Sequence, residues 1–252
     1  MEALSAIFTG SLARYRNAFV FSETDRPCVP AVDLLQPDSF DRIVAPFVAR
    51  HPGADRRAVI SFWTQWYFGI LIPPAVAANL LLDVDLPLAL DEVGVLLHEE
   101  EHRPTGFRLP SVGRKLEPDA DAFQRFHRLV GLHVEPLVDA VARTSGLAAR
   151  LVWSNAGNYF DWIVRELEEG KHTHERDPGG RDGRGDEGAA SIGMRHLGSR
   201  LRPDGSKNPL FQPVRPVEQD GEEVLQRRIC CLRYLLPGIA ACGDRCPLEH
   251  VT

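Results

Sequence analysis

The residues best suited to chemistry are four cysteines near the C-terminal end of the 252-residue chain: Cys230, Cys231, Cys242 and Cys246. Disulfides do not persist in a reducing cytosol, so a dense cysteine cluster in an intracellular protein indicates metal binding or redox chemistry. A two-iron [2Fe-2S] cluster and a structural zinc ion both take four thiolates. Zinc sites use paired Cys-x2-4-Cys units, and only Cys242 and Cys246 have that spacing. Adjacent side chains on a helix diverge by about 100°, so Cys230 and Cys231 fit different irons of a wider cluster better than one small ion.

The fifth cysteine, Cys28, stands alone in sequence and is expected to be an ordinary buried thiol.

Four arginines accompany these cysteines in sequence: Arg227, Arg228, Arg233 and Arg245. A fully thiolate-ligated two-iron cluster is anionic, and reduction adds a further negative charge. Positive side chains near the sulfurs would therefore favour the reduced state. The alternative for any one of these arginines is a place on a solvated face, where most charged side chains lie.

The composition is that of an ordinary globular protein, with 44% hydrophobic and 25% charged residues. The formal net charge of -6 argues against a broad nucleic-acid surface, because polyanion binding depends on clustered Lys and Arg. The start of the chain carries Glu2 where a secretory signal has basic residues, so a cytoplasmic location is expected.

Residues 58–82 have the length of a membrane span, but they include Ser, Thr, Gln and Asn and the pair Pro73-Pro74. Buried helices are expected there rather than a transmembrane segment, which leaves open a peripheral membrane contact.

Helices are expected at residues 39–50 and 55–72, where plausible caps precede apolar residues spaced by three and four. Pro73-Pro74 is expected to end the second helix, with another starting at residues 75–82. Alternating apolar residues within 91–109 flank an Arg-Pro-Thr-Gly turn sequence, which predicts a β-hairpin. A further helix is expected from Pro118 to Leu137, kinked or split at Pro136, and another over 147–167 with Gly157 as its weak point.

The sequence changes character at residue 168. Gly, Asp, Arg and His dominate residues 168–208, which predicts a long loop or mobile connector. Residues 222–234 are expected to form a helix that Pro237-Gly238 ends, followed by a tight loop around the last two cysteines. The predicted organisation is a mainly helical body at 1–170, a flexible connector rich in Gly, Asp and Arg at 171–208, and a cysteine-bearing segment at 209–252.

Aromatic residues supply a candidate substrate pocket. Trp63, Trp66 and Tyr67 could form walls for a bulky, mostly neutral ligand. The further candidates for this pocket are Trp153, Asn155 and Arg228. The helical spacing of the aromatic residues fits a core face as well, and packing is favoured over a pocket role.

Residues 98–102, His-Glu-Glu-Glu-His, match the zincin motif His-Glu-x-x-His literally. Zinc chemistry at this motif requires both imidazoles on one helix face. This stretch instead lies beside the predicted hairpin turn, so an exposed acidic turn is favoured over a metalloprotease site.

The cysteine motif resembles a known family signature. Residues 227–238, Arg-Arg-Ile-Cys-Cys-Leu-Arg-Tyr-Leu-Leu-Pro-Gly, and residues 242–246, Cys-Gly-Asp-Arg-Cys, are similar to the C-terminal signature of the FhuF-type ferric siderophore reductases. Weaker similarity extends through Phe-Trp-Thr-Gln-Trp-Tyr at 62–67, Pro73-Pro74 and Trp-Ser-Asn at 153–155. Three residues separate Cys242 from Cys246 here, where the family pattern has two.

The resemblance implies a cytoplasmic oxidoreductase that reduces iron in imported hydroxamate siderophores, with a [2Fe-2S] cluster on Cys230, Cys231, Cys242 and Cys246. Fe(III) is held by hard oxygen donors, and one added electron weakens that attraction, so reduction becomes release. The electron donor is expected to be a ferredoxin, a flavin reductase or a small reductant. Two alternatives stay open: a zinc-stabilised binding or regulatory protein, and a [2Fe-2S] electron-transfer subunit acting on a protein partner. The expected fold is α+β and predominantly helical, with a small β-hairpin element and a short C-terminal iron–sulfur segment.

Overall fold

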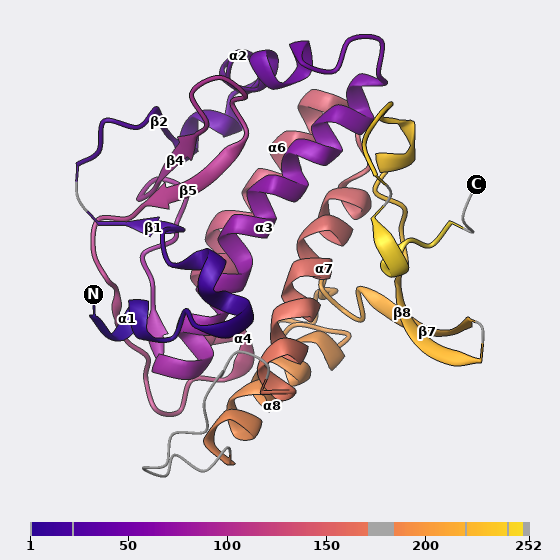
Figure 1. The fold of residues 1–252 in the computed structure, drawn as a ribbon. Coiled ribbons are helices and arrows are strands. Elements are labelled where there is room, and N and C mark those ends of the chain that lie inside the picture. Colours follow the sequence, from indigo (N-terminus) through magenta and orange to yellow (C-terminus); the bar gives the residue numbers. More distant parts are fainter. Residues whose placement is uncertain (1, 22, 171–183, 220, 241, 249–252) are drawn as a thin grey trace.

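The computed structural model describes residues 2–21, 23–170, 184–219, 221–240 and 242–248. Helices dominate, with small sheets beside them (Figure 1), which confirms the expected α+β class. The helices are α1 (Glu2–Ala6), α2 (Pro37–Ala49), α3 (Arg56–Leu82), α4 (Ala122–Arg125), α5 (His127–Leu129), α6 (Glu135–Ser145), α7 (Ala149–Glu168) and α8 (Arg184–Gly198). Short 3-10 turns are η1 (Gly10–Tyr15), η2 (Ala31–Leu35), η4 (Arg233–Leu235) and η5 (Gly243–Arg245), and η3 (Val130–Val134) is a π-helical turn. The strands are β1 (Phe19–Val20), β2 (Cys28–Pro30), β3 (Val84–Asp85), β4 (Gly94–Leu97), β5 (Pro104–Arg108), β6 (Arg114–Lys115), β7 (Val214–Gln219) and β8 (Glu222–Arg227).

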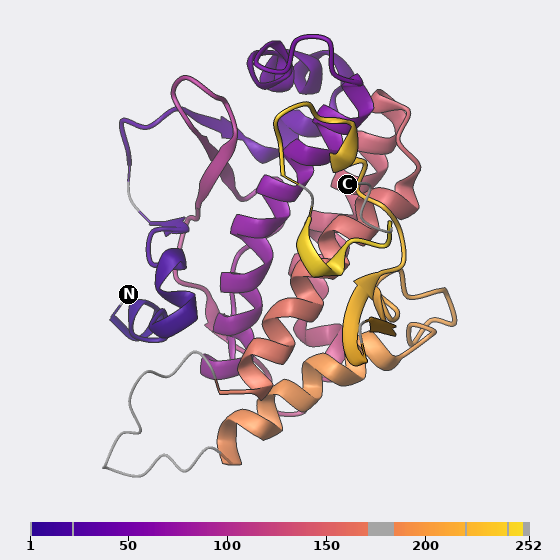
Figure 2. The same ribbon diagram turned by 45° about the vertical axis from the view of Figure 1, so that its right-hand side comes forward.

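The long helix α3 runs through the middle of the fold and packs most extensively against α7 (Figures 1 and 2). Its N-cap is Asp55, whose Oδ1 accepts the backbone N–H of Arg57 at 2.8 Å. The predicted break at Pro73-Pro74 is wrong, because both prolines lie inside one continuous helix of 27 residues. Each proline removes one intrahelical hydrogen bond. Both prolines are buried among neighbouring elements, and this packing outweighs the local preference to stop.

Helix α3 also has the length and composition of a membrane span. In the part of the chain that the structure describes, it is the one helix that meets both criteria, and 72% of its most apolar window is buried inside the fold. Burial to this extent is typical of a core helix. The sequence predicted buried helices over 58–82; the burial is confirmed, but the structure has one helix there and not two.

The four-stranded sheet has the order β1-β5-β4-β2. Strands β4 and β5 pair antiparallel with Val95 opposite Phe107, which confirms the hairpin expected within 91–109. The Phe107 ring lies edge-on to Tyr67 of α3, with centroids 5.1 Å apart, so the hairpin covers one side of that helix.

The histidines of the zincin-like motif lie in the turn between β4 and β5. The Nδ1 atom of His98 accepts the backbone N–H groups of Glu100 and Glu101, each at 3.3 Å. His102 has a left-handed φ of 53°. No helix carries the two imidazoles on one face in this turn, so the metalloprotease alternative is excluded.

The helix expected over 118–137 begins later, at a capping box formed by Asp121 and Gln124. It is interrupted at Phe126, passes through the π-helical turn η3 and continues directly into α6 with Pro136 in the first turn, so the chain is not split at that proline. Helix α7 confirms the helix expected over 147–167. Gly157 does not interrupt α7. A Cβ there would lie 2.6 Å from the Pro213 Cβ, so glycine allows the C-terminal part of the chain to approach the helix.

Part of the loop expected over 168–208 is helix α8, so that expectation is wrong for residues 184–198. Residues 171–183 lie outside the described residues. Helix α8 packs against α7, and a Cβ at Gly193 would lie 2.5 Å from the Val164 Cγ2. Glycine-rich composition favours a loop by local propensity, but here a glycine permits close helix packing.

The helix expected over 222–234 is also wrong. Residues 222–227 form β8, which pairs antiparallel with β7 and is followed by a loop that carries Cys230 and Cys231. Gln219 pairs with Glu222, so the two-residue sequence Asp-Gly separates the strands. This sequence is a strong hairpin signal, and Gly221 has the left-handed φ, 82°, that such turns use.

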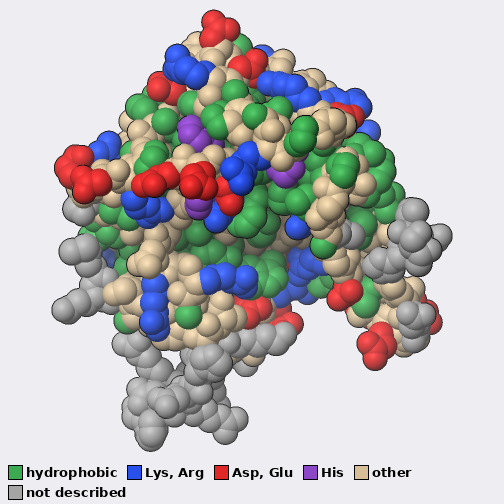
Figure 3. Space-filling view, turned by 45° about the horizontal axis from the view of Figure 1, so that its top comes forward, with side chains coloured by type: hydrophobic (Ala, Val, Ile, Leu, Met, Phe, Trp, Pro, Cys, Tyr) green, Lys and Arg blue, Asp and Glu red, His purple; other side chains and the backbone are tan. Residues whose placement is uncertain are grey.

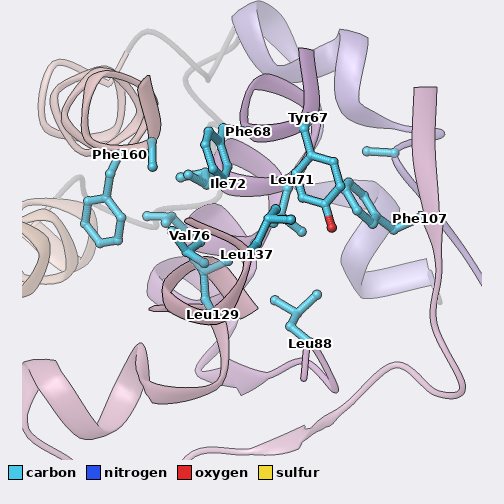
Figure 4. Close-up of a cluster of buried hydrophobic side chains, with 14 of the residues drawn as sticks. Tyr67, Phe68, Leu71, Ile72, Val76, Leu88, Phe107, Leu129, Leu137 and Phe160 are labelled. Carbon is cyan, nitrogen blue, oxygen red and sulfur yellow. The ribbon is translucent and has the colours of Figure 1, made fainter. Parts of the chain in front are cut away.

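The hydrophobic core joins α3, α6, α7 and the hairpin (Figure 4). One polar chain crosses it: the Tyr67 hydroxyl donates to Nε2 of His133 at 2.7 Å, and Nδ1–H of His133 donates to the Leu88 carbonyl at 2.6 Å. Complete burial lowers the pKa of His133 to about 4, so this ring is neutral at pH 7.

Candidate metal centre

Residues 228–248, here called the cysteine segment, run from the end of β8 across α3 and α7 (Figure 2). The Ser61 hydroxyl of α3 donates to the Cys231 carbonyl at 2.7 Å. The Ser154 hydroxyl of α7 donates to the Ile229 carbonyl at 3.4 Å. Two helices that are rigidly packed on each other therefore position the loop that bears the first two cysteines.

The four cysteine side chains lie close enough to interact with one another. The Cys242 thiol donates a hydrogen bond to the Cys231 sulfur and shares a second one with Cys246. Cys230 interacts electrostatically with Cys231 and Cys246, so the four cysteines form one interacting group, here called the cysteine ring. Within the described ranges, no three Cys, His, Asp or Glu side chains converge as the ligands of a single metal ion do.

The surroundings of the sulfurs favour a thiolate at one of them. The hydrogen bond from Cys242 lowers the pKa of Cys231 to about 6, and the charge of Arg227 acts in the same direction against the cost of burial. The same hydrogen bond raises the pKa of Cys242 far above its ordinary value. Burial raises the pKa of Cys230. In the metal-free chain, Cys231 is therefore the first of these three to lose its proton.

Backbone amides also face the sulfurs. The N–H of Leu232 donates to the Cys230 sulfur at 3.3 Å, and the N–H of Arg233 donates to Cys231. Leu232 itself has a left-handed φ of 63°, an unfavourable conformation for a branched side chain that the surrounding contacts must hold. Hydrogen bonds of this kind stabilise metal-bound thiolates.

A buried polar network lies beneath the cysteine segment. The Asn155 side-chain amide donates to Thr64 Oγ1 at 2.9 Å and to the carbonyl and hydroxyl oxygens of Ser61, each at 3.1 Å. The Asn155 Oδ1 accepts a hydrogen bond from the guanidinium of Arg227, which is 2% exposed. Arg227 also donates to the Ser154 hydroxyl at 3.3 Å. The network thus fixes a buried positive charge next to Cys230 and Cys231.

The second half of the cysteine segment is anchored by Arg245, which lies between Cys242 and Cys246. Its guanidinium contacts Asp161 Oδ2 of α7 at 3.0 Å and Asn158 Oδ1 at 3.3 Å. The Asp161 side chain is 3% exposed, and its other oxygen binds Arg165 at 3.0 Å. One buried carboxylate therefore holds the loop between the last two cysteines against the same helix that contacts the first two.

Comparison with known protein families assigns the chain. The family model described as "Ferric iron reductase FhuF-like transporter" matches residues 61–221. The chain belongs to this family. The model of the FhuF 2Fe-2S C-terminal domain matches residues 227–248, which include all four cysteines of the ring. A relative, the ferric siderophore reductase of Escherichia coli (strain K12), is 29% identical over 199 residues, which cover 77% of this chain and 67% of the relative. This member of the FhuF family is thus an iron-reducing oxidoreductase with a C-terminal [2Fe-2S] domain.

The residues around the ring fit an anionic cluster. The Nε atoms of Arg227 and Arg233 are buried and have no hydrogen-bond partner in the protein. Among the described residues, neither arginine forms an ion pair with a carboxylate, and Arg233 lies 5.0 Å from the centroid of the Phe62 ring. A buried cation without a counter-charge is costly. Thiolates together with a negatively charged iron–sulfur core supply that counter-charge, so the donor set and the orphaned N–H groups agree with the family assignment.

The structure separates the six residues predicted for a substrate pocket. Trp63 and Tyr67 are fully buried, so packing describes their role, and the indole N–H of Trp63 donates to the His102 carbonyl at 3.1 Å. Trp153 is half-buried against the core, and Asn155 belongs to the buried network. Arg228 is turned to Gln212, donating to its carbonyl at 2.7 Å. Trp66 lines an open cavity, together with Tyr159 of α7.

Several positioning residues escape sequence reasoning. Ser61 and Thr64 are polar residues in an otherwise apolar helix, and that contrast is the signal that could have marked them. Asp161 and Ser154 lie on the amphipathic α7 with no comparable signal. Their partners are 73 to 170 residues away in sequence, which local pattern cannot reveal.

Proposed function

We propose that this protein reduces Fe(III) in hydroxamate-type siderophores by one electron and that Cys230, Cys231, Cys242 and Cys246 hold its [2Fe-2S] cluster. The observation that supports the ligand set best is the cysteine ring beside the buried Arg227 and the half-buried Arg233, which form no ion pair with a carboxylate among the described residues. The name of the relative supports a siderophore as substrate. We place the reaction in the cytoplasm, with the body at 1–170, the connector at 171–208 and the cysteine-bearing part at 209–252.

The chain contributes charge and position to this reaction. Bound at the four sulfurs, the cluster supplies one electron at a time. Arg227, which is buried, and Arg233, which is half-buried, reduce the electrostatic cost of each added electron because the charge of each acts on Cys231. Ser61, through the Cys231 carbonyl, and Asp161, through Arg245, keep the two halves of the segment together. The electron enters from an external donor, such as a ferredoxin, a flavin reductase or a small reductant, and Fe(III) leaves as the more weakly held Fe(II).

The decisive experiment compares cysteine variants of the protein purified without air. Each of the four ring cysteines is changed to Ser, and Cys28→Ser serves as the matched control. Cys28 lies in β2, where its sulfur faces Gly94 of the neighbouring strand. Iron and zinc content, the visible absorption spectrum and electron paramagnetic resonance after dithionite are measured for each protein.

We expect two irons per chain and a reducible signal in the wild type and in Cys28→Ser, and loss of both in each ring variant. Reduction of a ferric hydroxamate, followed with a ferrous trap, should disappear with the signal. A colourless protein with one zinc per chain would instead support the zinc-stabilised binding or regulatory protein. A reducible cluster that transfers electrons to a protein but never to a chelate would support the electron-transfer subunit.

A further inference from the structure

A cavity of about 320 Å³ lies where η1, α3, the start of β5 and α7 meet. Side chains from all four elements line it: Arg14, Gln65, Trp66, Arg103, Thr105 and Tyr159. Trp66 is 39% exposed, so its indole ring forms an aromatic wall that faces solvent. Aromatic walls with a few convergent polar groups are typical of small-molecule sites.

Tyr159 connects this cavity with the cysteine ring. Its side chain lines the cavity and packs over Gly69 of α3. A Cβ at position 69 would lie 3.0 Å from the aromatic ring of Tyr159. Tyr159 is half-buried, and Cys231, Arg227 and Arg233 act electrostatically on its hydroxyl. One side chain thus separates the cavity from the neighbourhood of Cys231. A ligand in the cavity would lie next to the proposed cluster.

The cavity is positively charged although the chain has a net charge of -6. Arg103 lies 4.6 Å from the centroid of the Trp66 ring and donates through Nε to Glu101 at 2.6 Å. No hydrogen bond of the described residues uses its terminal NH2 groups. Arg14 lies over aromatic rings, 5.1 Å from the centroid of Trp162, and forms no ion pair within the described residues.

The opposing acidic groups are few. Glu101 is engaged by Arg103, and Glu166 acts on Tyr15 beside Arg14. Figure 3 shows one face of the molecule, where Lys and Arg side chains, with Asp and Glu side chains among them, lie around hydrophobic side chains. Guanidinium groups with unused N–H donors bind carboxylates well, because two parallel hydrogen bonds match the geometry of the anion.

We propose that this cavity binds the ferric chelate and prefers hydroxamate chelates that also carry free carboxylate groups, with Arg14 and Arg103 as the carboxylate-binding side chains. The inference rests on the proposed function, and it adds the substrate class. The apolar part of the chelate lies against Trp66, and its anionic arms reach the two arginines. A neutral trihydroxamate complex lacks these arms and gains only the aromatic contact.

The test uses gallium complexes, because Ga(III) matches the charge of Fe(III) but is not reduced, so binding is measured apart from electron transfer. Isothermal titration of the holoprotein compares a Ga(III) complex of a carboxylate-bearing dihydroxamate with a neutral Ga(III) trihydroxamate. Arg14→Gln and Arg103→Gln are compared with Arg108→Gln, the matched control. Arg108 lies on the same strand as the cavity wall and pairs with the exposed Glu23 at 2.9 Å.

We expect the wild type to bind the carboxylate-bearing complex at least about tenfold more tightly at low salt, with a preference that shrinks as salt screens the charges. Arg14→Gln and Arg103→Gln should each weaken that complex about tenfold and change the neutral one less than about twofold. Arg108→Gln should change neither. Equal affinity for both complexes at every salt concentration, or equal losses in the control, would overturn the proposal.

The salt dependence is measured on the wild type and needs no variant, so it decides the question even if an arginine variant fails to fold. Reduction assays with the Fe(III) forms separate the two proposals. If both ferric complexes are reduced without any preference, the inference is wrong and the proposed function stands. If neither complex is bound or reduced, the proposed function itself fails.

Discussion

Arg245→Gln should loosen the loop between Cys242 and Cys246 without disturbing helix α7. Arg245 is 24% exposed and binds a carboxylate, Asp161, that is 3% exposed. A hydrogen-bonded charge pair of this kind contributes about 2 kcal/mol. Removing it therefore raises the population of the undocked loop about 30-fold. Loss of the cluster to excess iron chelator, followed anaerobically as bleaching of the visible absorption, should accelerate by up to that factor.

Arg165→Gln is the matched control, because Arg165 binds the other oxygen of the same carboxylate at 3.0 Å and does not belong to the cysteine segment. It removes the same charge and leaves Asp161 with one guanidinium, as Arg245→Gln does. We expect bleaching of this variant to stay within about threefold of the wild type, as for an i,i+4 pair on a helix. Equal acceleration in both variants would show that Asp161 acts through the stability of α7 and not by holding the loop. An Arg245→Gln protein that bleaches like the wild type would refute the anchoring role outright.

Two further predictions concern buried charge. Arg227→Gln should lower the reduction potential of the cluster by about 60 mV, the equivalent of about 1.4 kcal/mol, because a buried positive charge beside Cys231 is lost. The control is Arg228→Gln, because the guanidinium of Arg228 is turned to Gln212. In the same redox titration, this control should shift the potential by less than half as much. The pKa of His133 is depressed to about 4, so its contribution to stability is complete above the unfolded value of 6.5 and is lost as the pH falls towards 4. Urea unfolding at pH 7 and pH 4.5 should show a loss of about 2.4 kcal/mol that is absent in His133→Gln, and equal losses in both proteins would contradict this account.

The parts of the fold that the sequence predicts correctly are those in which local pattern and burial agree. Alternating apolar residues in 91–109 became a hairpin, and the apolar periodicity over 147–167 became α7. The failures arise where packing overrides propensity. Pro73-Pro74 should end a helix by local chemistry, yet contacts around α3 keep it continuous. The β7–β8 hairpin was accessible to sequence reasoning through its Asp-Gly turn, but the apolar spacing of residues 224–232 favoured a helix.

The site divides in the same way. Cysteine chemistry depends on residue type and close spacing, so the four sulfurs can be singled out from sequence. The residues that hold them cannot, because Ser61, Ser154 and Asp161 contact the cysteine segment only after two helices pack side by side. The aromatic residues Trp63 and Tyr67 are fully buried, which agrees with the packing role that the sequence favours over a pocket.

The unpaired arginines have a consequence for how the segment folds. Arg227 is 2% exposed, so its guanidinium has lost its hydration. Among the described residues, no carboxylate forms an ion pair with it in place of water. In the absence of an anionic centre, this burial opposes docking of the cysteine segment on α3 and α7. With the cluster in place, the same charge stabilises both the cluster and the docked segment. Cluster binding and docking therefore form one coupled equilibrium, in which each favours the other by the same free energy. With the ligand set proposed above, the counter-charge of this buried cation arrives with the cofactor.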